Sequence, residues 1–255
     1  MLVGCMMWRI GRILDLHEQL GWLRANRFGA VAFWTCAGEP GVWQGFDFAS
    51  AAQEDVRALR AALEGFRAVD LHADVPLWDE ETLRRLQRIT AFGGDLGAST
   101  VTVHVEAEGP WLREALGSLE EAAETADVRI GLELTCSYDL AMGDTTPRVG
   151  LTLDVGHVSF GDGAGYREFG SIGGLIRHVG SRLVHVHAHD YDGALDHLPV
   201  GAGKLDWTDI ATGLRSIGYR GVVCLELNPD RASPEQLLDS RDRLKTLLVA
   251  SAASR

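Results

Sequence analysis

Short apolar runs recur along the whole chain, and longer stretches of mixed polarity separate them. Many runs begin at a glycine or after a helix-like stretch, and their apolar residues are mostly consecutive, as in strands buried on both faces of a parallel sheet. The pattern predicts eight strands, at Leu2–Trp8, Gly29–Trp34, Ala68–His72, Thr100–His104, Arg129–Glu133, Gly150–Asp154, Leu183–His187 and Gly221–Glu226.

Amphipathic stretches lie between the predicted strands. In Ala52–Leu63 and Trp111–Ala123, Leu, Val and Ala recur at spacings of three and four residues, with Arg and Glu opposite them. The last helix is predicted to open at Ser233–Glu235, where a serine cap precedes a proline in the first turn. The stretch from Glu133 to Asp154 is too short for an ordinary helix, so an abbreviated one is expected there.

This alternation of strand and helix predicts an α/β protein with the (β/α)₈ TIM-barrel fold. The length of 255 residues agrees with the roughly 250 residues that such a barrel needs. The hydrophobic fraction of 46% is enough to fill a large core. Because no low-complexity run or Pro/Ser linker interrupts the chain, we expect one domain over residues 1–255.

The charge of the chain narrows the class of partner. A formal net charge of −12 argues against a general nucleic-acid binder or a protein that binds anionic membranes. A bound cation could still hold a phosphate group, because the charge of the ion dominates the local field. We therefore expect a small-molecule substrate and regard nucleic acid as a disfavoured partner.

Cysteine usage and the amino-terminal segment indicate a cytoplasmic protein. Cys5, Cys36, Cys136 and Cys224 include no close pair and no Cys-x-x-Cys spacing, which favours a reducing compartment. The first residues lack the charged lead and long apolar core of a signal peptide, and no run approaches about 18 apolar residues. We therefore predict neither a cleaved leader nor a membrane span.

Residues of the types that bind metals close four of the predicted strands. These residues are Glu133, Asp154, His187 and Glu226. Because the carboxyl ends of parallel barrel strands meet at one rim, the four side chains are expected to converge. Three carboxylates and one imidazole suit Mn²⁺, Mg²⁺, Co²⁺ or Zn²⁺. One strand-end carboxylate would ordinarily be a solvated residue, but four in register predict a metal centre.

The alternation of residues in Leu183–His189 sorts three histidines onto one face. His185, His187 and His189 share a face, and Val184 and Val186 share the other. If the valines face the helices, all three histidines face the barrel axis. His185 is then expected to be a hydrogen-bonded interior residue and His187 to lie at the mouth.

Five segments carry a resemblance to a known family: Gly131–Glu133, Leu153–His157, His185–Asp190, Asp196–Asp206 and Cys224–Glu226. In this order they resemble the xylose isomerase-like superfamily, which spans sugar isomerases and epimerases and the class II apurinic endonucleases. The resemblance implies a TIM barrel with a divalent metal held by the four strand-end residues.

Four further histidines are candidates for a second metal or for substrate binding: His72, His104, His157 and His197. In the endonuclease branch, histidines at such places help to hold a second and a third zinc, with the strand-five glutamate bridging. Many isomerase relatives have similar histidines without the full trinuclear site. The endonuclease Asp-x-His becomes Leu195-Asp196-His197 here, and this departure counts against a third metal.

The leading functional hypothesis is a metal-dependent sugar or sugar-phosphate isomerase or epimerase. A divalent ion would lower the cost of an enediolate, and two carboxylates on opposite sides of the substrate would move the proton. Glu133 and Glu226 are the expected pair, since the equivalent glutamates of related epimerases bind metal and shuttle protons. His157 would position a hydroxyl, and His187 would remain a ligand.

Other functions are less well supported by the sequence. The alternative is a multinuclear zinc phosphoesterase of the apurinic-endonuclease type, but the chain is too short for the large basic or aromatic loops that enter a duplex. A protein that kept the barrel only for binding is a third possibility. The two lysines, Lys204 and Lys245, do not end strands, which disfavours a Schiff-base aldolase, and no Gly-x-Gly-x-x-Gly follows a strand.

Two features have both a functional and a structural interpretation. The loop Gly201–Lys204 could bring backbone amides to a phosphate, or its glycines could permit a tight turn. Trp8, Trp34 and Trp78 lie near the ends of the first three strands and could line a sugar pocket or pack into the core. The oligomeric state is left open, with a homo-oligomer as one possibility.

Overall fold

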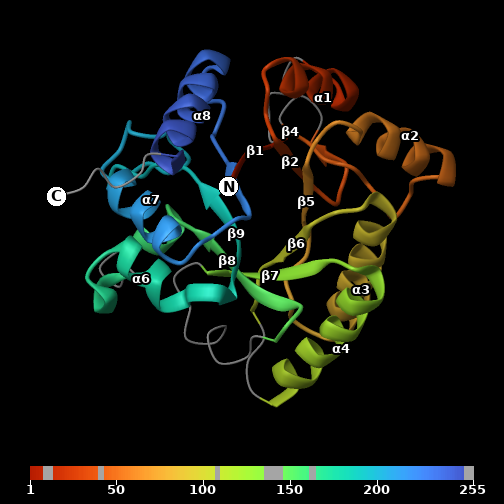
Figure 1. Ribbon diagram of the computed structural model, residues 1–255. Helices are drawn as coiled ribbons and strands as arrows, with labels where there is room; N and C mark the ends of the chain where they lie inside the picture. Colours follow the sequence, from red (N-terminus) through yellow and green to blue (C-terminus); the bar gives the residue numbers. More distant parts are fainter. Residues whose placement is uncertain (8–13, 40–42, 107–109, 135–145, 161–164, 250–255) are drawn as a thin grey trace.

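Eight parallel strands close into a barrel that helices surround on the outside (Figure 1). The computed structural model describes residues 1–7, 14–39, 43–106, 110–134, 146–160 and 165–249. Around the barrel the order is β1-β2-β5-β6-β7-β8-β9-β10, so each strand pairs with the next barrel strand along the chain and β10 pairs with β1. The predicted α/β (β/α)₈ fold is confirmed.

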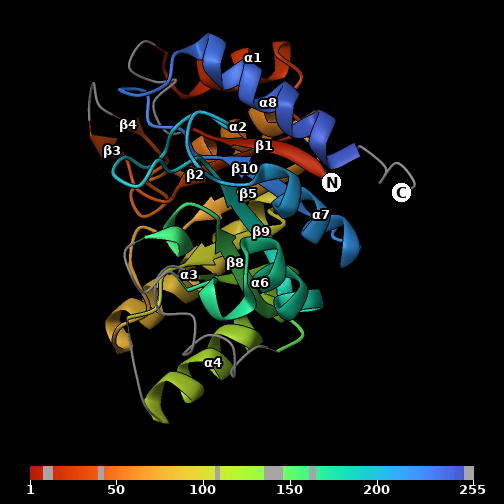
Figure 2. The same ribbon diagram turned by 90° about the vertical axis from the view of Figure 1, so that its left-hand side faces the viewer.

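The barrel strands agree closely with the predicted apolar runs. Their bounds are β1 Leu2–Met6, β2 Ala30–Trp34, β5 Ala68–His72, β6 Thr100–Val103, β7 Arg129–Leu134, β8 Val149–Asp154, β9 Leu183–Ala188 and β10 Val222–Leu225. A two-stranded antiparallel hairpin that was not predicted, β3 (Gly38–Glu39) with β4 (Trp43–Gln44), follows β2. In Figure 2, β1 runs from the N-terminus towards the end of the barrel where this hairpin lies.

The helices also form where the amphipathic pattern predicts them. Their bounds are α1 Leu16–Ala25, α2 Gln53–Leu63, α3 Glu80–Leu96, α4 Pro110–Ala126, α6 Ile172–Val179, α7 Trp207–Ser216 and α8 Pro234–Val249, with short 3₁₀ turns at His157–Ser159, Arg167–Phe169 and Gly180–Arg182. The abbreviated helix expected between Glu133 and Asp154 falls mainly on residues 135–145, outside the described residues. Within the described chain, none of the helices has the length and apolar character needed to cross a membrane.

The core has two parts, one between the sheet and the helices and one inside the barrel. The inner part is small and apolar: Met6, Ala30, Ala32, Ala68, Val222 and Cys224. It comes from β1, β2, β5 and β10 only. The interior beside β5 to β9 instead holds buried polar side chains, among them Asp70, Thr100, Thr102, Thr152 and His185. One half of the barrel is thus filled by small apolar residues, and the other half forms a polar floor under the rim.

A register shift between β8 and β9 changes which side chains face inward. Leu151 pairs with Leu183 and Thr152 pairs with His185, so Val184 is an extra residue in β9. A Cβ atom at Gly150 would lie 2.3 Å from Val184 Cγ1, so that glycine makes room for the valine inside the barrel. The expectation that Val184 faces the helices is therefore wrong, because the bulge interrupts the alternation. Val186 does lie in the outer core, as expected.

The loop between β9 and α7 is folded around one buried carboxylate. Asp190 Oδ1 accepts hydrogen bonds from the amides of Tyr191 (2.8 Å) and Leu205 (3.2 Å). Its Oδ2 accepts from the Gly201 amide (2.7 Å) and from Trp207 Nε1 (2.9 Å). Because these four donors span the loop from end to end, Asp190 fixes the path of the segment that carries His197.

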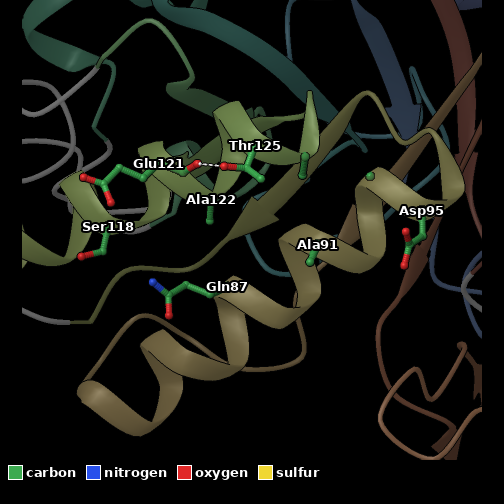
Figure 3. A pocket seen from close by; sticks show the side chains of 9 residues that line it. Gln87, Ala91, Asp95, Ser118, Glu121, Ala122 and Thr125 are labelled. Carbon is green, nitrogen blue, oxygen red and sulfur yellow. Dashed lines mark hydrogen bonds between the residues drawn. The ribbon is translucent and has the colours of Figure 1, made fainter.

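A groove lies outside the barrel between α3 and α4 (Figure 3). Its volume is about 600 Å³, and its lining includes Gln87, Ala91, Ser118, Glu121 and Thr125. None of the residues expected to carry the chemistry lines it, so the groove is separate from the barrel mouth.

Replacing the buried loop anchor should destabilise the protein. In Asp190→Asn, an amide NH₂ would face two of the four N–H donors, leaving them buried without an acceptor. We expect a loss of about 2–4 kcal/mol in the free energy of unfolding, measured by urea denaturation. The matched control is Asp239→Asn, which makes the same charge change at an exposed position of α8 and should shift stability by less than about 0.5 kcal/mol. Equal effects of the two substitutions would contradict the anchoring role.

Candidate metal centre

The four predicted strand-end residues lie together at the carboxyl rim. Glu133 is in β7, Asp154 ends β8, His187 is in β9, and Glu226 directly follows β10. These strands are consecutive neighbours in the barrel, and Asp154 pairs with His187 in the register. All four residues are buried. The sequence therefore placed them at the correct edge of the correct strands.

Glu133 lies among imidazole rings. Its Oε2 is 2.8 Å from His104 Nε2 and 3.1 Å from His72 Nε2. Its Oε1 is 3.6 Å from His187 Nδ1 and 3.8 Å from His157 Nδ1. Burial alone would raise the pKa of this carboxyl, but the surrounding histidines, His187 above all, hold the pKa well below its ordinary value. Glu133 is therefore ionised at neutral pH despite being buried.

Asp154 has two carboxylate oxygens with different surroundings. Its Oδ1 accepts hydrogen bonds from the amides of Gly156 (2.9 Å) and His157 (2.8 Å). Its Oδ2 lies 3.1 Å from His157 Nδ1 and accepts no hydrogen bond from the described residues. Burial opposes ionisation, but His189 and His157 lower the pKa of Asp154 below its usual value.

His187 joins the two glutamates. Its Nδ1 lies 3.6 Å from Glu133 Oε1 and 3.5 Å from Glu226 Oε1, and it makes no hydrogen bond to the described residues. Burial lowers the pKa of His187, but the charges of Glu226 and Glu133 outweigh it and raise the pKa to about 10. At this pKa the ring is protonated at neutral pH, whereas a metal ligand would need a free nitrogen.

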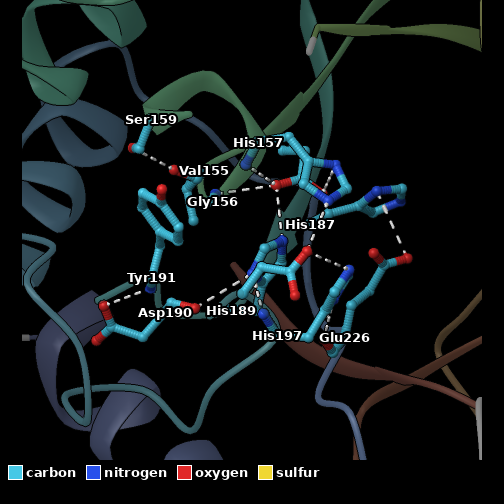
Figure 4. A network of polar contacts seen from close by, with 12 residues as sticks. Val155, Gly156, His157, Ser159, His187, His189, Asp190, Tyr191, His197 and Glu226 are labelled. Atoms are coloured by element: carbon cyan, nitrogen blue, oxygen red, sulfur yellow. Dashed lines mark hydrogen bonds and ion pairs between the residues drawn. The ribbon is translucent and has the colours of Figure 1, made fainter. Parts of the chain in front are cut away.

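The second set of predicted histidines also reaches the mouth. His72 and His104 contact Glu133, while His157 and His197 lie face to edge with ring centroids 5.2 Å apart (Figure 4). Burial opposes protonation of His157, but the charges of Asp154 and Glu133 raise its pKa to about 9. For His197, burial and the charge of His189 lower the pKa.

The hydrogen bond of His72 to the backbone indicates a cation site beside Glu133. His72 Nδ1 lies 3.0 Å from the carbonyl oxygen of Ala73, an arrangement in which Nδ1 carries a proton and donates it. Nε2 then presents its lone pair to Glu133 Oε2, 3.1 Å away. Two electron-rich atoms at this separation need a proton or a metal ion between them.

Several sets of side chains have the spacing that one metal ion needs. Their candidate ligand atoms lie within 4.8 Å of one another in the sets His72–His104–Glu133, His72–His187–Glu226, Glu133–Asp154–His157 and His157–His189–His197. The first three sets overlap and contain all four predicted ligands. Asp154 Oδ2 and His187 Nδ1, which make no hydrogen bond to the described residues, are buried atoms of the kind that a metal ion would satisfy. The donor atoms therefore fit a divalent cation.

Two residues of the site were not predicted. His189 was assigned only to a strand face, yet its Nε2 lies 2.9 Å from Asp154 Oδ1. Arg231 pairs with Asp196, whose Oδ2 lies 3.9 Å from both His157 Nε2 and His197 Nε2. The Leu183–His189 alternation could have revealed His189, but no local pattern links Arg231 to Asp196.

His185 was expected to be hydrogen-bonded, and this expectation is wrong. Neither of its ring nitrogens makes a hydrogen bond within the described chain, although its Nδ1 lies 3.7 Å from Asp70 Oδ2. Burial raises the pKa of Asp70 to about 7 and lowers that of His185 well below its ordinary value. At neutral pH His185 is thus uncharged, and Asp70 is about half protonated beneath the rim.

Three of the four amides in the proposed phosphate loop already have acceptors within the protein. The Gly201 amide donates to Asp190, the Ala202 amide to the Pro199 carbonyl and the Lys204 amide to the Tyr191 carbonyl. Gly201 has φ +85°, so the tight-turn interpretation is the better one.

The predicted aromatic wall is present in part. The Trp34 ring stacks on His72 with centroids 3.9 Å apart, which places an aromatic face beside Glu133. Trp78 is 58% exposed, so it is not a core residue. Trp8 lies outside the described residues.

The chain is similar to sugar epimerases in sequence and structure. It is 26% identical to a D-psicose 3-epimerase of Ruminiclostridium cellulolyticum over a match that covers 62% of this chain and 56% of that relative. The chain therefore spans little more than half the length of this curated relative. A crystal structure of D-psicose 3-epimerase with D-tagatose from Clostridium cellulolyticum H10 matches with a TM-score of 0.74, 16% identity and coverage of 98% of this chain and 100% of that chain.

The structure of an IolI protein with a bound zinc atom is also similar. It matches with a TM-score of 0.73 and 18% identity, covering 97% of this chain and 98% of that chain. The family model described as the xylose isomerase-like TIM barrel matches residues 22–247, which is most of the sequence. The chain therefore belongs to the xylose isomerase-like TIM-barrel family.

Proposed function

We propose that the protein is a metal-dependent epimerase or isomerase of a small sugar. The observation that carries this proposal is the pair of buried glutamates that reach one imidazole nitrogen from two strands, Glu133 at 3.6 Å and Glu226 at 3.5 Å from His187 Nδ1. The similarity to a D-psicose 3-epimerase supports a ketose as the substrate.

Glu133, Asp154, His187 and Glu226 would hold the metal ion. Asp154 Oδ2 and His187 Nδ1, without hydrogen bonds to the described residues, and the crowded lone pairs of His72 and Glu133 support this assignment. A bound divalent ion would supply positive charge beside the substrate carbonyl and so favour the enediolate. The zinc atom of the similar IolI structure supports a divalent metal without fixing which metal this chain binds.

The two glutamates would move the proton. Glu133 is ionised at neutral pH because histidines surround it, so it can accept a proton from the substrate carbon. Glu226, from the other side of His187, would return a proton to the same carbon in epimerisation or to its neighbour in isomerisation. His157, which is partly exposed at the mouth, would orient a hydroxyl group, and the Trp34 face would cover the substrate beside His72.

The internal hydrogen bonds of three amides in the Gly201–Lys204 loop favour an unphosphorylated sugar over a sugar phosphate as the substrate. The amides of Gly201, Ala202 and Lys204 already have acceptors within the protein.

A single domain over residues 1–255, a cytoplasmic location and a homo-oligomer remain predictions.

A multinuclear zinc phosphoesterase is the second candidate, because the rim holds more metal-type side chains than one ion needs. His72, His104 and Glu133 form one such set beside the proposed centre. Against this candidate, Asp196 is paired with Arg231 and so is partly neutralised as a ligand.

Removing either proposed proton carrier should abolish turnover while the fold persists. Glu133→Gln and Glu226→Gln each keep the side-chain shape but cannot take a proton, so kcat on a ketose panel should fall by at least about 100-fold. Glu121→Gln, at an exposed position of α4, is the control and should match the parent protein. Circular dichroism would check the fold. A parental rate in either site variant would contradict the two-carboxylate scheme.

Metal loading should reverse the pH dependence of stability. Without metal, the pKa values of His157 and His187 rise from 6.5 to about 9 and about 10 on folding. Their protonated rings therefore stabilise the fold fully below pH 6.5, and this contribution is lost as pH rises to about 10. Urea midpoints in EDTA should therefore fall over this window. With Mn²⁺ they should rise, because His187, the histidine assigned as a ligand, binds a metal only as the neutral ring. Parallel slopes would contradict a metal held by His187.

The two candidate functions differ in metal content and in substrate. We expect the purified protein to hold a single tightly bound divalent ion per chain, to epimerise or isomerise a ketose, and to leave abasic DNA intact. Elemental analysis and a nicking assay would measure these properties. Three zinc ions per chain together with strand cleavage would favour the phosphoesterase instead.

A further inference from the structure

His189 lies between a proposed metal ligand and the loop that carries His197. It is fully buried one residue beyond the end of β9, on the side of the strand that faces the mouth (Figure 4). Its Nε2 is 2.9 Å from Asp154 Oδ1, and its ring stacks on His197 with centroids 3.9 Å apart. By distance alone, His189 forms a metal-sized set with His157 and His197.

A backbone hydrogen bond fixes the tautomer of His189. The amide of His197 donates to His189 Nδ1 over 2.9 Å, whereas the Asp190 carbonyl oxygen is farther from that nitrogen, at 3.4 Å; the shorter contact has Nδ1 presenting its lone pair to the His197 N–H. In the neutral ring the proton must then be on Nε2, which lies 2.9 Å from Asp154 Oδ1 without meeting the angular criteria of a hydrogen bond. A metal on Nε2 would need the opposite tautomer, which would set two N–H groups against each other. His189 is therefore not suited to be a ligand, despite its proximity to His157 and His197.

The contact of His189 completes an asymmetric environment around Asp154. Oδ1 accepts hydrogen bonds from the amides of Gly156 and His157, and His189 Nε2 lies 2.9 Å from the same oxygen as a close polar contact. Oδ2 accepts no hydrogen bond from the described residues. We propose that His189 is a positioning residue that occupies Asp154 Oδ1 and so leaves Oδ2 as the single oxygen aimed at a divalent cation. This inference rests on the metal centre of the proposed function.

Gly156 provides an independent way to move the same ring. A Cβ atom at Gly156 would lie 2.0 Å from His189 Cε1, so the ring packs directly over this glycine. The backbone of Gly156 has φ −80° and ψ −48°, which any residue adopts easily. Gly156→Ala would thus be strained by the His189 ring and not by its own backbone.

Co²⁺ titration of the metal-free protein tests the proposal without requiring turnover. His189→Phe keeps a ring but removes the N–H group, and we expect Co²⁺ affinity by calorimetry to fall by about 10- to 100-fold with unchanged stoichiometry. His189→Gln, whose amide nitrogen can donate to Asp154 Oδ1, should restore most of the affinity. The visible spectrum of bound Co²⁺ should change in the Phe variant and return towards the parental spectrum in the Gln variant.

A double-mutant cycle covers the case in which His189→Phe does not fold. Gly156→Ala should weaken Co²⁺ binding in the parent protein, because it displaces the His189 ring. In the His189→Ala background the space is open, so adding Gly156→Ala should cause no further loss. Equal and additive losses in the two backgrounds would overturn the proposal.

The remaining outcomes separate this inference from the proposed function. A loss of one bound Co²⁺ per chain in His189→Phe would make His189 a ligand and overturn the positioning role. Parental Co²⁺ affinity in that variant would also overturn it, because His189 would then have no effect on the metal. Failure of the parent protein to bind Co²⁺ would overturn the inference together with the metal centre. If the parent protein binds Co²⁺ but turns over no sugar, and the His189 effects appear as expected, the proposed function fails and the inference is supported.

Discussion

The organisation of the barrel mouth depends on keeping a buried carboxylate charged. Glu133 is only 8% exposed, and a carboxylate in such a place would normally take up a proton. Four imidazole rings prevent this, and they come from strands or strand ends on both sides of β7. Each ring can reach Glu133 only if its own strand ends at the right height. The ionisation of Glu133 therefore depends on the register of the sheet. The charged side chains of the rim are thus already assembled by contacts within the protein itself.

The unequal filling of the barrel supports this arrangement from below. Small apolar residues such as Ala30, Ala68 and Cys224 fill the side bounded by β1, β2, β5 and β10. On the opposite side, an uncharged His185 and a partly protonated Asp70 lie beneath the rim. The polar side chains are thus concentrated under β5 to β9, which carry most of the candidate ligands. A fully apolar layer directly under the rim would disfavour the charged rings above it. The polar floor reduces this penalty.

The sequence predicted the fold and most of the rim because both depend on local patterns. Each barrel strand is a short run of apolar residues, and metal-type residues such as Glu133 and Asp154 close these runs. Features that depend on contacts between distant segments were not predictable in this way. The bulge at Val184 exists because Gly150 leaves space on another strand, and the role of His189 depends on the path of a loop that Asp190 folds. His197 has φ +49°, a conformation that its residue type does not suggest. The family resemblance inferred from five motifs is confirmed by the match over residues 22–247.

The bulge in β9 is a point at which this barrel can change in length without losing its mouth. Two adjacent side chains, Val184 and His185, both point inward, because Val184 is the extra residue of the strand. Deleting the Val184 codon would leave Leu183 opposite Leu151 and His185 opposite Thr152, so the histidines that follow would stay on the same side of the strand. The cost would be the space that the valine now fills beside Gly150. In a strand without a bulge, the same deletion would turn every later side chain to the opposite face.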